Sequence, residues 1–431
     1  MNIQLEPCSI GGQVTVPPSK SMAHRAVLAA ALAEGTSVIR NLAFSKDIQA
    51  TLNGVARLGA QVQPGPGRGC VTITGAGRPD PSRFESAQAV DCGESGSTLR
   101  FFIPVFSLTG KPVCFVGGGL LMKRPQQVYA DLFHARGLQF RQTDDYIYQM
   151  GALTAGEYTF PGNVSSQFVT GLLYALPMLE GDSVLTLTGR VESRPYIDLT
   201  LSALADFGVT ARWEGENRLI IPGGQRFRPC DYTVEGDYSQ AAFPAVLGAI
   251  TGGVAVTGLR PDSLQGDAAI LDILHRCGAD FTFENGRAEF RAAPLKSTCI
   301  DLAACPDLGP ILMVLGLFCE GETRIENAGR LRIKESDRIA VMQQELAKFG
   351  GTVLADGDMV TVQGLGGRLS TPAEPLDSHN DHRVAMACAV AAWAAGAPAL
   401  MQDAGAVTKS WPTFFLDMQS GLGAANRGAS C

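Results

Sequence analysis

The sequence predicts an α/β protein made of two domains, and three observations support that prediction. The chain has 431 residues, of which 45% are hydrophobic, so it can bury more than one core. A polar start followed by a small, apolar helix recurs about every 70 residues. A glycine, a strand-like run and usually an amphipathic stretch follow each recurrence. We therefore expect about six copies of a helix–strand–helix–strand unit.

The first helix of each copy is apolar on nearly all sides, so it should lie at the centre of its domain. The glycine that follows it suits a helix C-terminus, where the backbone turns to positive φ. The polar starts of these six helices are Ser21, Ser97, Ser165, Ser239, Asp307 and Asp381.

The second helix of a copy is amphipathic. Its apolar residues recur at i, i+3, i+4 and i+7, as they do around Leu201 and Leu204. This pattern predicts helices that lie nearer the surface, over 51–62, 129–140, 200–211, 270–281 and 341–353.

Six copies divide naturally into two domains of three. The loop 223–237, which is rich in glycine and proline, separates the third copy from the fourth. We predict a first domain over 19–228 and a second over 229–431. A single solenoid of six stacked copies is the alternative, but terminal capping copies are not evident.

Composition excludes several classes of protein. The net charge is −7 and there is no basic tail, which argues against a nucleic-acid partner. The eleven cysteines form no C-x-x-C pair, so neither a disulfide framework nor a zinc site is expected. The N-terminus lacks the pattern of a signal peptide, and proline and glycine interrupt the apolar runs 241–259 and 384–401. We expect a cytoplasmic protein with no membrane partner.

The polar helix starts also carry cations. The N-terminus of a helix favours capping oxygens and anions, because its first N–H groups are unpaired and its dipole is positive there. Capping explains each serine or aspartate taken alone. It does not explain the cations Lys20, Arg25, Arg100 and Arg383, which are unfavourable there unless an anion lies nearby. If the central helices direct their N-termini at one face, that face binds a multiply charged anion.

Further cations lie between the copies. Arg124 and Lys409 are two of them. In the stretch KESDR, Lys334 and Arg338 are four residues apart, which predicts that they share one helical face next to Glu335. A solvated first turn with salt bridges is the alternative interpretation of that stretch.

Eight motifs now occur in a recognisable order: SKSMAHR, GESGSTLR, KRP, VSSQF, SRPYID, PD at 306–307, IKESDR and NDHR. Each is modest alone, but the ordered set resembles the 5-enolpyruvylshikimate-3-phosphate synthase family from about Lys20 to Lys409. The resemblance implies a two-domain inside-out α/β barrel, in which each domain has three βαβαββ repeats with central buried helices. It also implies that the N-terminal segment 1–18 joins the second domain.

The resemblance implies a reaction. The enolpyruvyl group of phosphoenolpyruvate would move to the 5-hydroxyl of shikimate 3-phosphate, with release of phosphate, in the biosynthesis of chorismate and the aromatic amino acids. Both substrates carry a phosphate and a carboxylate, which is the clustered negative charge that the helix starts predict. The resemblance implies no cofactor and no metal, and it makes glyphosate an expected inhibitor. We expect a monomer.

The resemblance also assigns residues. Those matched to shikimate 3-phosphate are Lys20, Ser21, Arg25, Ser165, Ser166, Gln167, Ser193, Tyr196, Asp307 and Lys334. Those matched to phosphoenolpyruvate are Lys20, Gly96, Arg124, Gln167, Arg338, Arg383 and Lys409.

Four residues have implied catalytic roles. Asp307 would take the proton of the attacking hydroxyl, and Glu335 would protonate the methylene carbon. Lys20 would assist the departure of phosphate, and His382 would orient Glu335 or the substrate. Since clustered cations depress the pKa of a carboxylate, we expect Asp307 to act through proximity more than through basicity.

Two departures and three alternatives accompany this assignment. Glu94 stands where the related GNAGT motif has Asn, and Arg330 stands where some members have Asn. The UDP-N-acetylglucosamine enolpyruvyl transferase is the nearest alternative, but it uses a loop cysteine, and the loop 117–127 contains none here. A noncatalytic phosphate-metabolite binding protein would need the cations but not Asp307 with Glu335. A metal site at the two histidines of SHNDHR lacks further ligands in its pattern.

Overall fold

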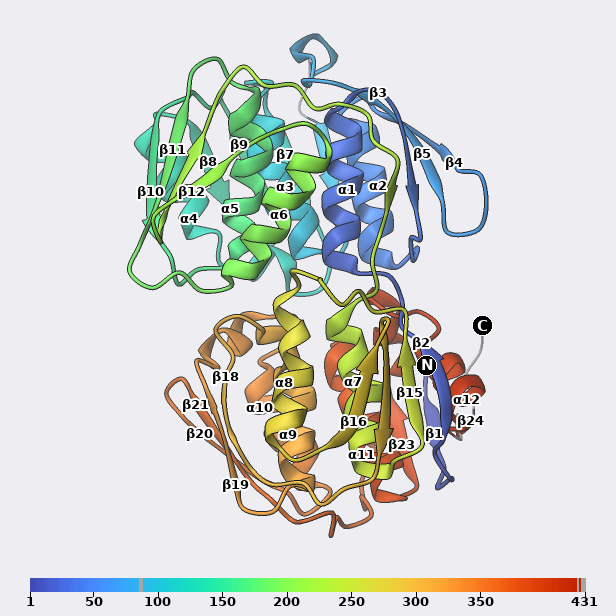
Figure 1. The fold of residues 1–431 in the computed structure, drawn as a ribbon. Coiled ribbons are helices and arrows are strands. Elements are labelled where there is room, and N and C mark those ends of the chain that lie inside the picture. The colour runs from blue at the N-terminus through green and yellow to red at the C-terminus, as the bar shows by residue number, and fades with distance from the viewer. Residues whose placement is uncertain (85–87, 425, 428–431) are drawn as a thin grey trace. The chain divides into compact units, whose positions relative to one another are not determined.

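The computed structural model describes residues 1–84, 88–424 and 426–427, and the chain in it forms two compact units. We call Pro18–Val234 the first unit, and Met1–Pro17 with Glu235–Cys431 the second unit. Each has its own hydrophobic core and its own set of helices and strands (Figure 1). The fold is therefore of the two-domain α/β class that the sequence predicts.

The first unit contains six helices and three four-stranded sheets among its described residues. Its helices are α1 (Lys20–Leu32), α2 (Lys46–Arg57), α3 (Gly96–Ser107), α4 (Gln127–Ala135), α5 (Ser166–Ala175) and α6 (Arg194–Asp206). Its sheets are ordered β14 (Tyr232–Thr233), β3 (Glu34–Arg40), β5 (Val71–Ala76), β4 (Gln61–Pro64); then β6 (Gln88–Asp91), β7 (Val113–Val116), β9 (Tyr146–Met150), β8 (Gln139–Gln142); and β10 (Glu157–Pro161), β11 (Ser183–Thr188), β13 (Arg218–Ile221), β12 (Arg212–Glu214).

The second unit has the same number of helices and sheets among its described residues. Its helices are α7 (Tyr238–Thr251), α8 (Ala269–Arg276), α9 (Gly309–Phe318), α10 (Arg338–Ala347), α11 (His382–Ala395) and α12 (Phe414–Leu422). Its sheets are ordered β16 (Asp280–Glu284), β17 (Arg287–Arg291), β15 (Val254–Thr257), β2 (Gly12–Thr15); then β18 (Cys299–Asp301), β19 (Glu322–Glu326), β21 (Met359–Gln363), β20 (Thr352–Asp356); and β22 (Leu376–Asp377), β23 (Ala399–Gln402), β1 (Ile3–Leu5), β24 (Asn426–Arg427).

Among the described residues, five of the six repeats follow the order βαβαββ along the chain, as the middle repeat of the first unit illustrates. In the sixth, β1 from the start of the chain completes the sheet of β22, β23 and β24. Strand β6 pairs in parallel with β7, with Val90 opposite Phe115, and α3 makes the crossover between them. Strand β9 then pairs antiparallel with both β7 and β8. The parallel pair needs a helical crossover, whereas the antiparallel pair needs only a short turn, so one helix lies between the first two strands.

Two strands belong to a different unit from the helix that follows them in the chain. Strand β2 pairs in parallel with β15, with Val14 opposite Val256, so it completes a sheet of the second unit. Strand β14 pairs in parallel with β3, with Tyr232 opposite Ile39, so it completes a sheet of the first unit. Each chain crossing thus comes directly after a strand.

The boundary between the two units, which we call the seam, lies later in the chain than predicted. We placed it between 228 and 229, yet residues 229–234 pack on the first unit. The backbone N–H of Cys230 donates to Ser37 Oγ at 3.1 Å, and Asp231 forms an ion pair with Arg40 at 3.0 Å. The physical reason is the strand pairing of β14, which a two-residue strand does not reveal in the sequence.

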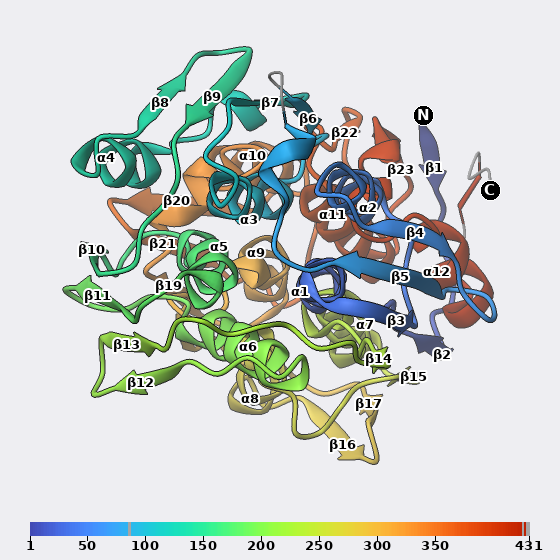
Figure 2. The same ribbon diagram turned by 90° about the horizontal axis from the view of Figure 1, so that it is seen from above.

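The central helices are buried, as predicted. All ten residues of α9 and twelve of the fourteen residues of α11 are buried. Small residues let these helices approach one another closely: a Cβ at Gly171 on α5 would lie 2.4 Å from the carbonyl oxygen of Arg100 on α3. The sheets lie outside them, and the sheet containing β10 and β11 flanks α5 and α6 (Figure 2). No helix among the described residues is long and apolar enough to cross a membrane.

The second helices begin earlier than the sequence predicts. Helix α2, for example, covers 46–57 where 51–62 was expected, and the last residues of that range begin β4. The Ser45 side chain caps α2 by accepting from the N–H of Ile48, and the helix ends before Gly59, whose φ is +104°. The periodic apolar pattern therefore identified the buried face of α2, but its predicted range also included the first residues of β4. Helix α12 was not predicted; its start has no capping side chain.

Candidate functional site

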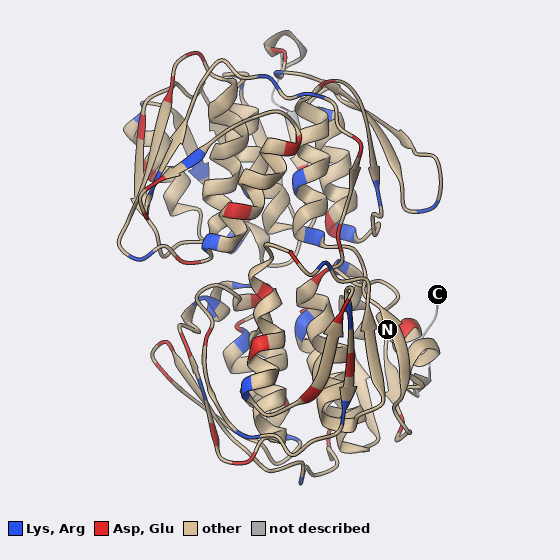
Figure 3. Cartoon of the chain, in the orientation of Figure 1, with Lys and Arg blue, Asp and Glu red and all other residues tan. Residues whose placement is uncertain are grey.

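The central helices, which are the first helices of the six repeats, are α1, α3, α5, α7, α9 and α11. They contain only four Lys, Arg, Asp or Glu residues, and all four are cations. Figure 3 colours these residues along the ribbon. They are Lys20, Arg25, Arg100 and Arg383, and each lies in the first two turns of its helix. A cation at that end opposes the helix dipole, so its placement needs a compensating anion.

The helices of the first unit begin at one common end. Arg25 of α1 donates to Thr170 of α5 at 3.3 Å and to Thr200 of α6 at 2.9 Å, and these residues all lie in the first two turns. Gln167 at the start of α5 donates to Ser97 at the start of α3 at 2.9 Å. The polar helix starts of this unit therefore form one face.

Arg25 is held entirely by neutral oxygens. Besides the two threonines, it donates to the carbonyl oxygens of Ser21 at 2.7 Å and Tyr196 at 2.8 Å, and only 2% of its surface is exposed. Burial lowers the pKa of Arg25, yet a guanidinium stays protonated at neutral pH. Its charge is positioned by the protein without being neutralised by a carboxylate.

Arg100 and Arg124 lie around the start of α3. Arg100 donates to the side-chain oxygen of Gln167 at 2.8 Å and stacks 4.7 Å from the centre of the Phe168 ring. A Cβ at Gly96 would lie 2.9 Å from Nη1 of Arg124, so the glycine leaves room for that guanidinium. Two cations and a helix N-terminus thus come together here.

Four other predicted residues of the first unit lie at the same helix starts. Lys20 forms an ion pair with Asp47 of α2 at 2.9 Å. Ser165 caps α5 by accepting from the N–H of Gln167, and Ser166 is the first residue of that helix. Ser193 precedes α6 in the left-handed conformation, with φ at +54°, which is rare for a residue with a side chain.

In the second unit, Asp307 is the centre of the corresponding cluster. Its Oδ1 lies 3.1 Å from Lys334 Nζ and 3.1 Å from Arg338 Nη1, and its Oδ2 lies 3.2 Å from Arg383 Nη2. About 23% of its side chain remains exposed, so the carboxylate is accessible as well as paired. Arg383 also donates to Ser239 at the start of α7 at 2.9 Å.

Arg338 joins that aspartate to two further carboxylates. It donates to Glu335 at 2.8 Å and to both oxygens of Asp381, at 2.8 and 3.3 Å. Asp381 is fully buried and caps α11 through the backbone N–H of Arg383. The helix starts of this unit are therefore joined by ion pairs.

The pKa values follow from these contacts. Burial alone would raise the pKa of Asp307, but the charges of Arg383, Lys334 and Arg338 outweigh it and hold the pKa well below its usual range. Burial lowers the pKa of Lys334 to about 8, although the Asp307 carboxylate acts in the opposite direction. Burial likewise opposes the charge of Arg338, but Asp381, Glu335 and Asp307 raise its pKa.

One local prediction is wrong. Lys334 and Arg338 do not share a helical face, because Lys334 ends the short 3₁₀ segment Gly329–Ile333 and Arg338 begins α10. The side chain of Asp337 caps α10 through the N–H groups of Ile339 and Ala340, which stops the helix from extending backwards. Both cations nevertheless contact the same aspartate.

The last two predicted residues lie beside α11. His382 is buried at the start of that helix, with its Nδ1 4.0 Å from an oxygen of Asp381. Lys409 ends the 3₁₀ segment Ala404–Lys409, and its Nζ donates to the carbonyl oxygen of Asn380. Among the residues that the structure describes, no group of three or more His, Cys, Asp or Glu is placed to hold a metal.

Sequence reasoning missed two carboxylates of these clusters. Asp381 was singled out as a helix start but not as the partner of Arg338, and Asp47 was not singled out at all. The signal for Asp47 was weak, because an acidic residue in the first turn is common for its effect on the dipole alone. The ion pair with Lys20 depends on the packing of α1 against α2.

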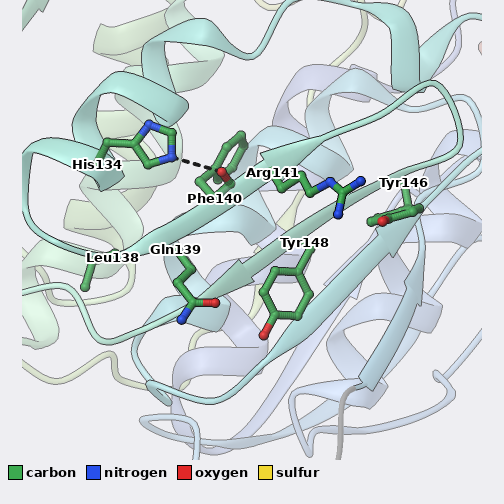
Figure 4. Close-up of a pocket in the computed structure, with 7 residues that line it drawn as sticks. All are labelled: His134, Leu138, Gln139, Phe140, Arg141, Tyr146 and Tyr148. Atoms are coloured by element: carbon green, nitrogen blue, oxygen red, sulfur yellow. Dashed lines mark hydrogen bonds between the residues drawn. The ribbon is translucent and has the colours of Figure 1, made fainter.

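A surface hollow of about 560 Å³ lies elsewhere on the first unit (Figure 4). It is formed by the end of α4 and by β8 and β9, and His134, Arg141 and Tyr148 are among the residues that line it. The ring of His134 is fixed by a 3.0 Å hydrogen bond to the backbone oxygen of Phe140. None of the predicted site residues lines this hollow, so it is distinct from the helix starts.

Known proteins are similar to this chain over almost its whole length. A 3-phosphoshikimate 1-carboxyvinyltransferase from Clostridium novyi (strain NT) is 40% identical over 429 residues, 97% of each chain. The solved EPSP synthase from Acinetobacter baumannii matches with a TM-score of 0.81 and 27% identity over 99% of each chain. The enolpyruvyl transferase NikO from Streptomyces tendae shares the fold, with a TM-score of 0.77 at 17% identity over 99% of this chain and 98% of its own.

The sequence model described as EPSP synthase (3-phosphoshikimate 1-carboxyvinyltransferase) matches residues 6–418. That range includes every motif quoted above and all six central helices. The repeats, the buried cations at the helix starts and this match lead to one conclusion: the chain belongs to the EPSP synthase family.

Proposed function

We propose that this chain transfers the enolpyruvyl group of phosphoenolpyruvate to the 5-hydroxyl of shikimate 3-phosphate and releases phosphate. The observation that carries the proposal is Asp307, an accessible carboxylate held by three cations at the common helix start of the second unit. Such a group can accept a proton from a hydroxyl, while the cations bind the anionic groups of both substrates.

The low pKa of Asp307 has a consequence for its role. In the free protein the carboxylate is a weak base, because Arg383, Lys334 and Arg338 stabilise its charge. When phosphate and carboxylate groups of the substrates bind these cations, their effect on Asp307 is partly compensated and its pKa rises. Substrate binding thus turns the aspartate into a better base at the moment when the hydroxyl is present.

The other roles follow from the same clusters. Glu335 is proposed to protonate the methylene carbon, since it lies 2.8 Å from Arg338 in the same ion-pair network. Lys20 is proposed to stabilise the departing phosphate, and His382 to orient Glu335 or the substrate. The buried, uncompensated charge of Arg25 supports its assignment to shikimate 3-phosphate, together with Ser165, Ser166, Gln167, Ser193 and Tyr196.

Phosphoenolpyruvate is assigned to a second set of residues, matched by the resemblance. Arg124 next to Gly96 supports binding of one of its anionic groups, because the helix N-terminus and the guanidinium act on the same place. Arg338, Arg383 and Lys409 are assigned to the same substrate. Glyphosate is expected to compete with phosphoenolpyruvate for these cations.

The direct test is a coupled assay of phosphate release with both substrates and with each omitted in turn. Release that requires both substrates supports the proposal. Saturable binding without release would favour the noncatalytic alternative. Activity with UDP-N-acetylglucosamine in place of shikimate 3-phosphate, together with inactivation by an epoxide thiol reagent, would favour the related transferase.

A further inference from the structure

A chain of four buried polar side chains connects the starts of α1, α2 and α3. His24 Nδ1 lies 2.7 Å from Thr51 Oγ1, which lies 2.7 Å from Thr98 Oγ1, which lies 2.8 Å from Ser95 Oγ. All four side chains belong to residues that are at most 1% exposed. Little solvent reaches these side chains, so their hydrogen bonds are assigned first among themselves.

The geometry fixes the direction of these hydrogen bonds. Thr98 donates to Ser95, so its single proton is spent, and the 2.7 Å contact between Thr51 and Thr98 needs the proton of Thr51. The carbonyl oxygen of Asp47, at 3.3 Å, is a more distant acceptor for that same proton. Thr51 then accepts from His24, which requires the proton on Nδ1. Burial and the charges of Lys20 and Arg25 hold the pKa of His24 well below its usual value, so the ring is neutral and carries only that proton. Along the three contacts of 2.7–2.8 Å, every donor points from His24 towards Ser95.

The proton of the Ser95 hydroxyl is left over. Its oxygen accepts from the backbone N–H of Thr98 at 3.2 Å and from the Thr98 hydroxyl, so both bonds use it as an acceptor. No acceptor for its own proton occurs among the hydrogen bonds of residues 1–84, 88–424 and 426–427. A buried hydroxyl donor without an acceptor costs free energy, so this proton is suited to a ligand.

The surroundings of Ser95 select the chemistry of that ligand. Ser95 caps α3, and the next residue is Gly96, against which the Arg124 guanidinium lies. An acceptor at this place would meet a hydroxyl donor, the unpaired N–H groups of the first helical turn and a nearby cation. Negatively charged oxygen satisfies all three.

We propose that the Ser95 hydroxyl donates a hydrogen bond to an anionic oxygen of phosphoenolpyruvate, and that His24 is a positioning residue that directs it through Thr51 and Thr98. The inference rests on the proposed function, because phosphoenolpyruvate is the ligand assigned to Gly96 and Arg124. A purely structural chain, which only ties three helices together, is the competing explanation.

The first experiment replaces Ser95 and measures both Michaelis constants together with the melting temperature. Ser95→Ala should raise the Michaelis constant for phosphoenolpyruvate about tenfold or more, since a hydrogen bond to a charged group is lost. The constant for shikimate 3-phosphate should stay within about twofold, and Ser95→Thr, which keeps the hydroxyl and the cap, should behave like the wild type.

Ser107 provides a matched control on the same helix. It is also 1% exposed, but its hydroxyl donates to the carbonyl oxygen of Pro104 at 2.6 Å, so its proton is already used. Ser107→Ala should lower the melting temperature and leave both Michaelis constants unchanged. The same behaviour in Ser95→Ala, a lower melting temperature alone, would overturn the proposal in favour of the structural explanation.

The second experiment tests the role of His24. In His24→Leu the direction of the hydrogen bonds among Thr51, Thr98 and Ser95 can reverse, so that the Ser95 proton turns inwards to Thr98. The Michaelis constant for phosphoenolpyruvate should then rise, though less than in Ser95→Ala. His24→Gln supplies an amide donor for Thr51 and should restore the wild-type Michaelis constant for phosphoenolpyruvate. His24→Leu added to Ser95→Ala should cause no further increase, because both changes remove the same hydrogen bond. An additive effect would contradict the positioning role.

Calorimetric titration with phosphoenolpyruvate in the presence of shikimate 3-phosphate distinguishes a failure of the proposed function from a failure of the proposed role of Ser95. Wild-type protein that binds phosphoenolpyruvate but releases no phosphate would overturn the proposed function, and the Ser95 variants would then be compared by their dissociation constants. Wild-type protein that does not bind phosphoenolpyruvate would overturn both proposals.

Discussion

Each unit places a buried arginine near a helix start, but the two arginines have different surroundings. Arg25 in the first unit is bound by hydroxyl and carbonyl oxygens, all of them neutral. Arg338 in the second unit contacts three carboxylates, those of Asp307, Glu335 and Asp381. The first arrangement keeps a positive charge uncompensated for a ligand. The second keeps carboxylates charged and in place, which is what the proposed proton transfer requires.

This contrast connects burial to function. A buried cation among neutral oxygens is costly until an anion arrives, so it favours binding. A buried cation among carboxylates is already compensated, so removing it exposes the charges that it held. Under the proposed function, the same residue type therefore contributes to affinity in one unit and to the integrity of the carboxylate cluster in the other.

The largest effect should come from Asp307 itself. Asp307→Ala is expected to lower the turnover number by about 10²–10⁴-fold, the range of general base catalysis, while both substrates still bind. Turnover from phosphate release and binding from calorimetry measure the two parts. Asp280→Ala, which removes an exposed carboxylate paired with Arg291, is the control and should keep wild-type turnover. Near-wild-type turnover in Asp307→Ala would remove this residue from the mechanism.

The arginines test the comparison directly through stability. Arg338→Met leaves three carboxylates without their common partner and should cost about 3–5 kcal/mol of unfolding free energy. Arg25→Met leaves only neutral acceptors unpaired and should cost about 1–3 kcal/mol. Urea denaturation of both variants measures the difference. Equal losses would mean that the two environments are energetically alike, and the comparison would fail.

The pH dependence sharpens the account of the second unit. Because the pKa of Lys334 is lowered to about 8, this lysine is charged below that pH and becomes neutral above it. The proposed contact of Lys334 with anionic shikimate 3-phosphate uses the charged form, so kcat/KM for this substrate should fall as the pH rises through about 8. Lys334→Arg, which stays protonated, should move the decrease to higher pH. A decrease at the same pH in that variant would assign it to another group.

The smallest effect belongs to an exposed pair far from this chemistry. Arg226 and Glu34 lie 3.1 Å apart, but both side chains are more than half exposed. Arg226→Ala should change the unfolding free energy by at most about 1 kcal/mol and leave turnover unchanged, because solvent screens the pair. Thermal unfolding at low and high salt measures this change. A loss of unfolding free energy comparable to that of Arg25→Met would show that burial does not distinguish an exposed arginine from a buried one.

The sequence allowed correct predictions where the residues of a single helix determine the local structure. The all-apolar face of α9 and the amphipathic face of α2 are periodic patterns, so the repeat and the central helices could be predicted. Ser165 and Asp381 could be identified as helix caps from their local sequence. The ordered motifs led to the family and, through it, to Asp307 and Arg124.

The sequence was uninformative where distant segments must pack. The pairing of Lys20 with Asp47 and of Arg338 with Asp381 depends on contacts between helices, which no local pattern contains. The seam was misplaced because β14 has two residues and pairs with a strand about 190 positions earlier. The KESDR stretch was misassigned because a cap at Asp337 divides it.

The exchange of strands at the two crossings has a consequence during synthesis on the ribosome. Strands β1 and β2 emerge first, but β2 finds its partner β15 only after about 240 further residues, and β1 must wait even longer for β23. The first unit, by contrast, is complete once β14 has appeared. The N-terminal seventeen residues are therefore an unpaired tail for most of translation, and a permuted gene that moves them to the end of the chain should shorten the wait.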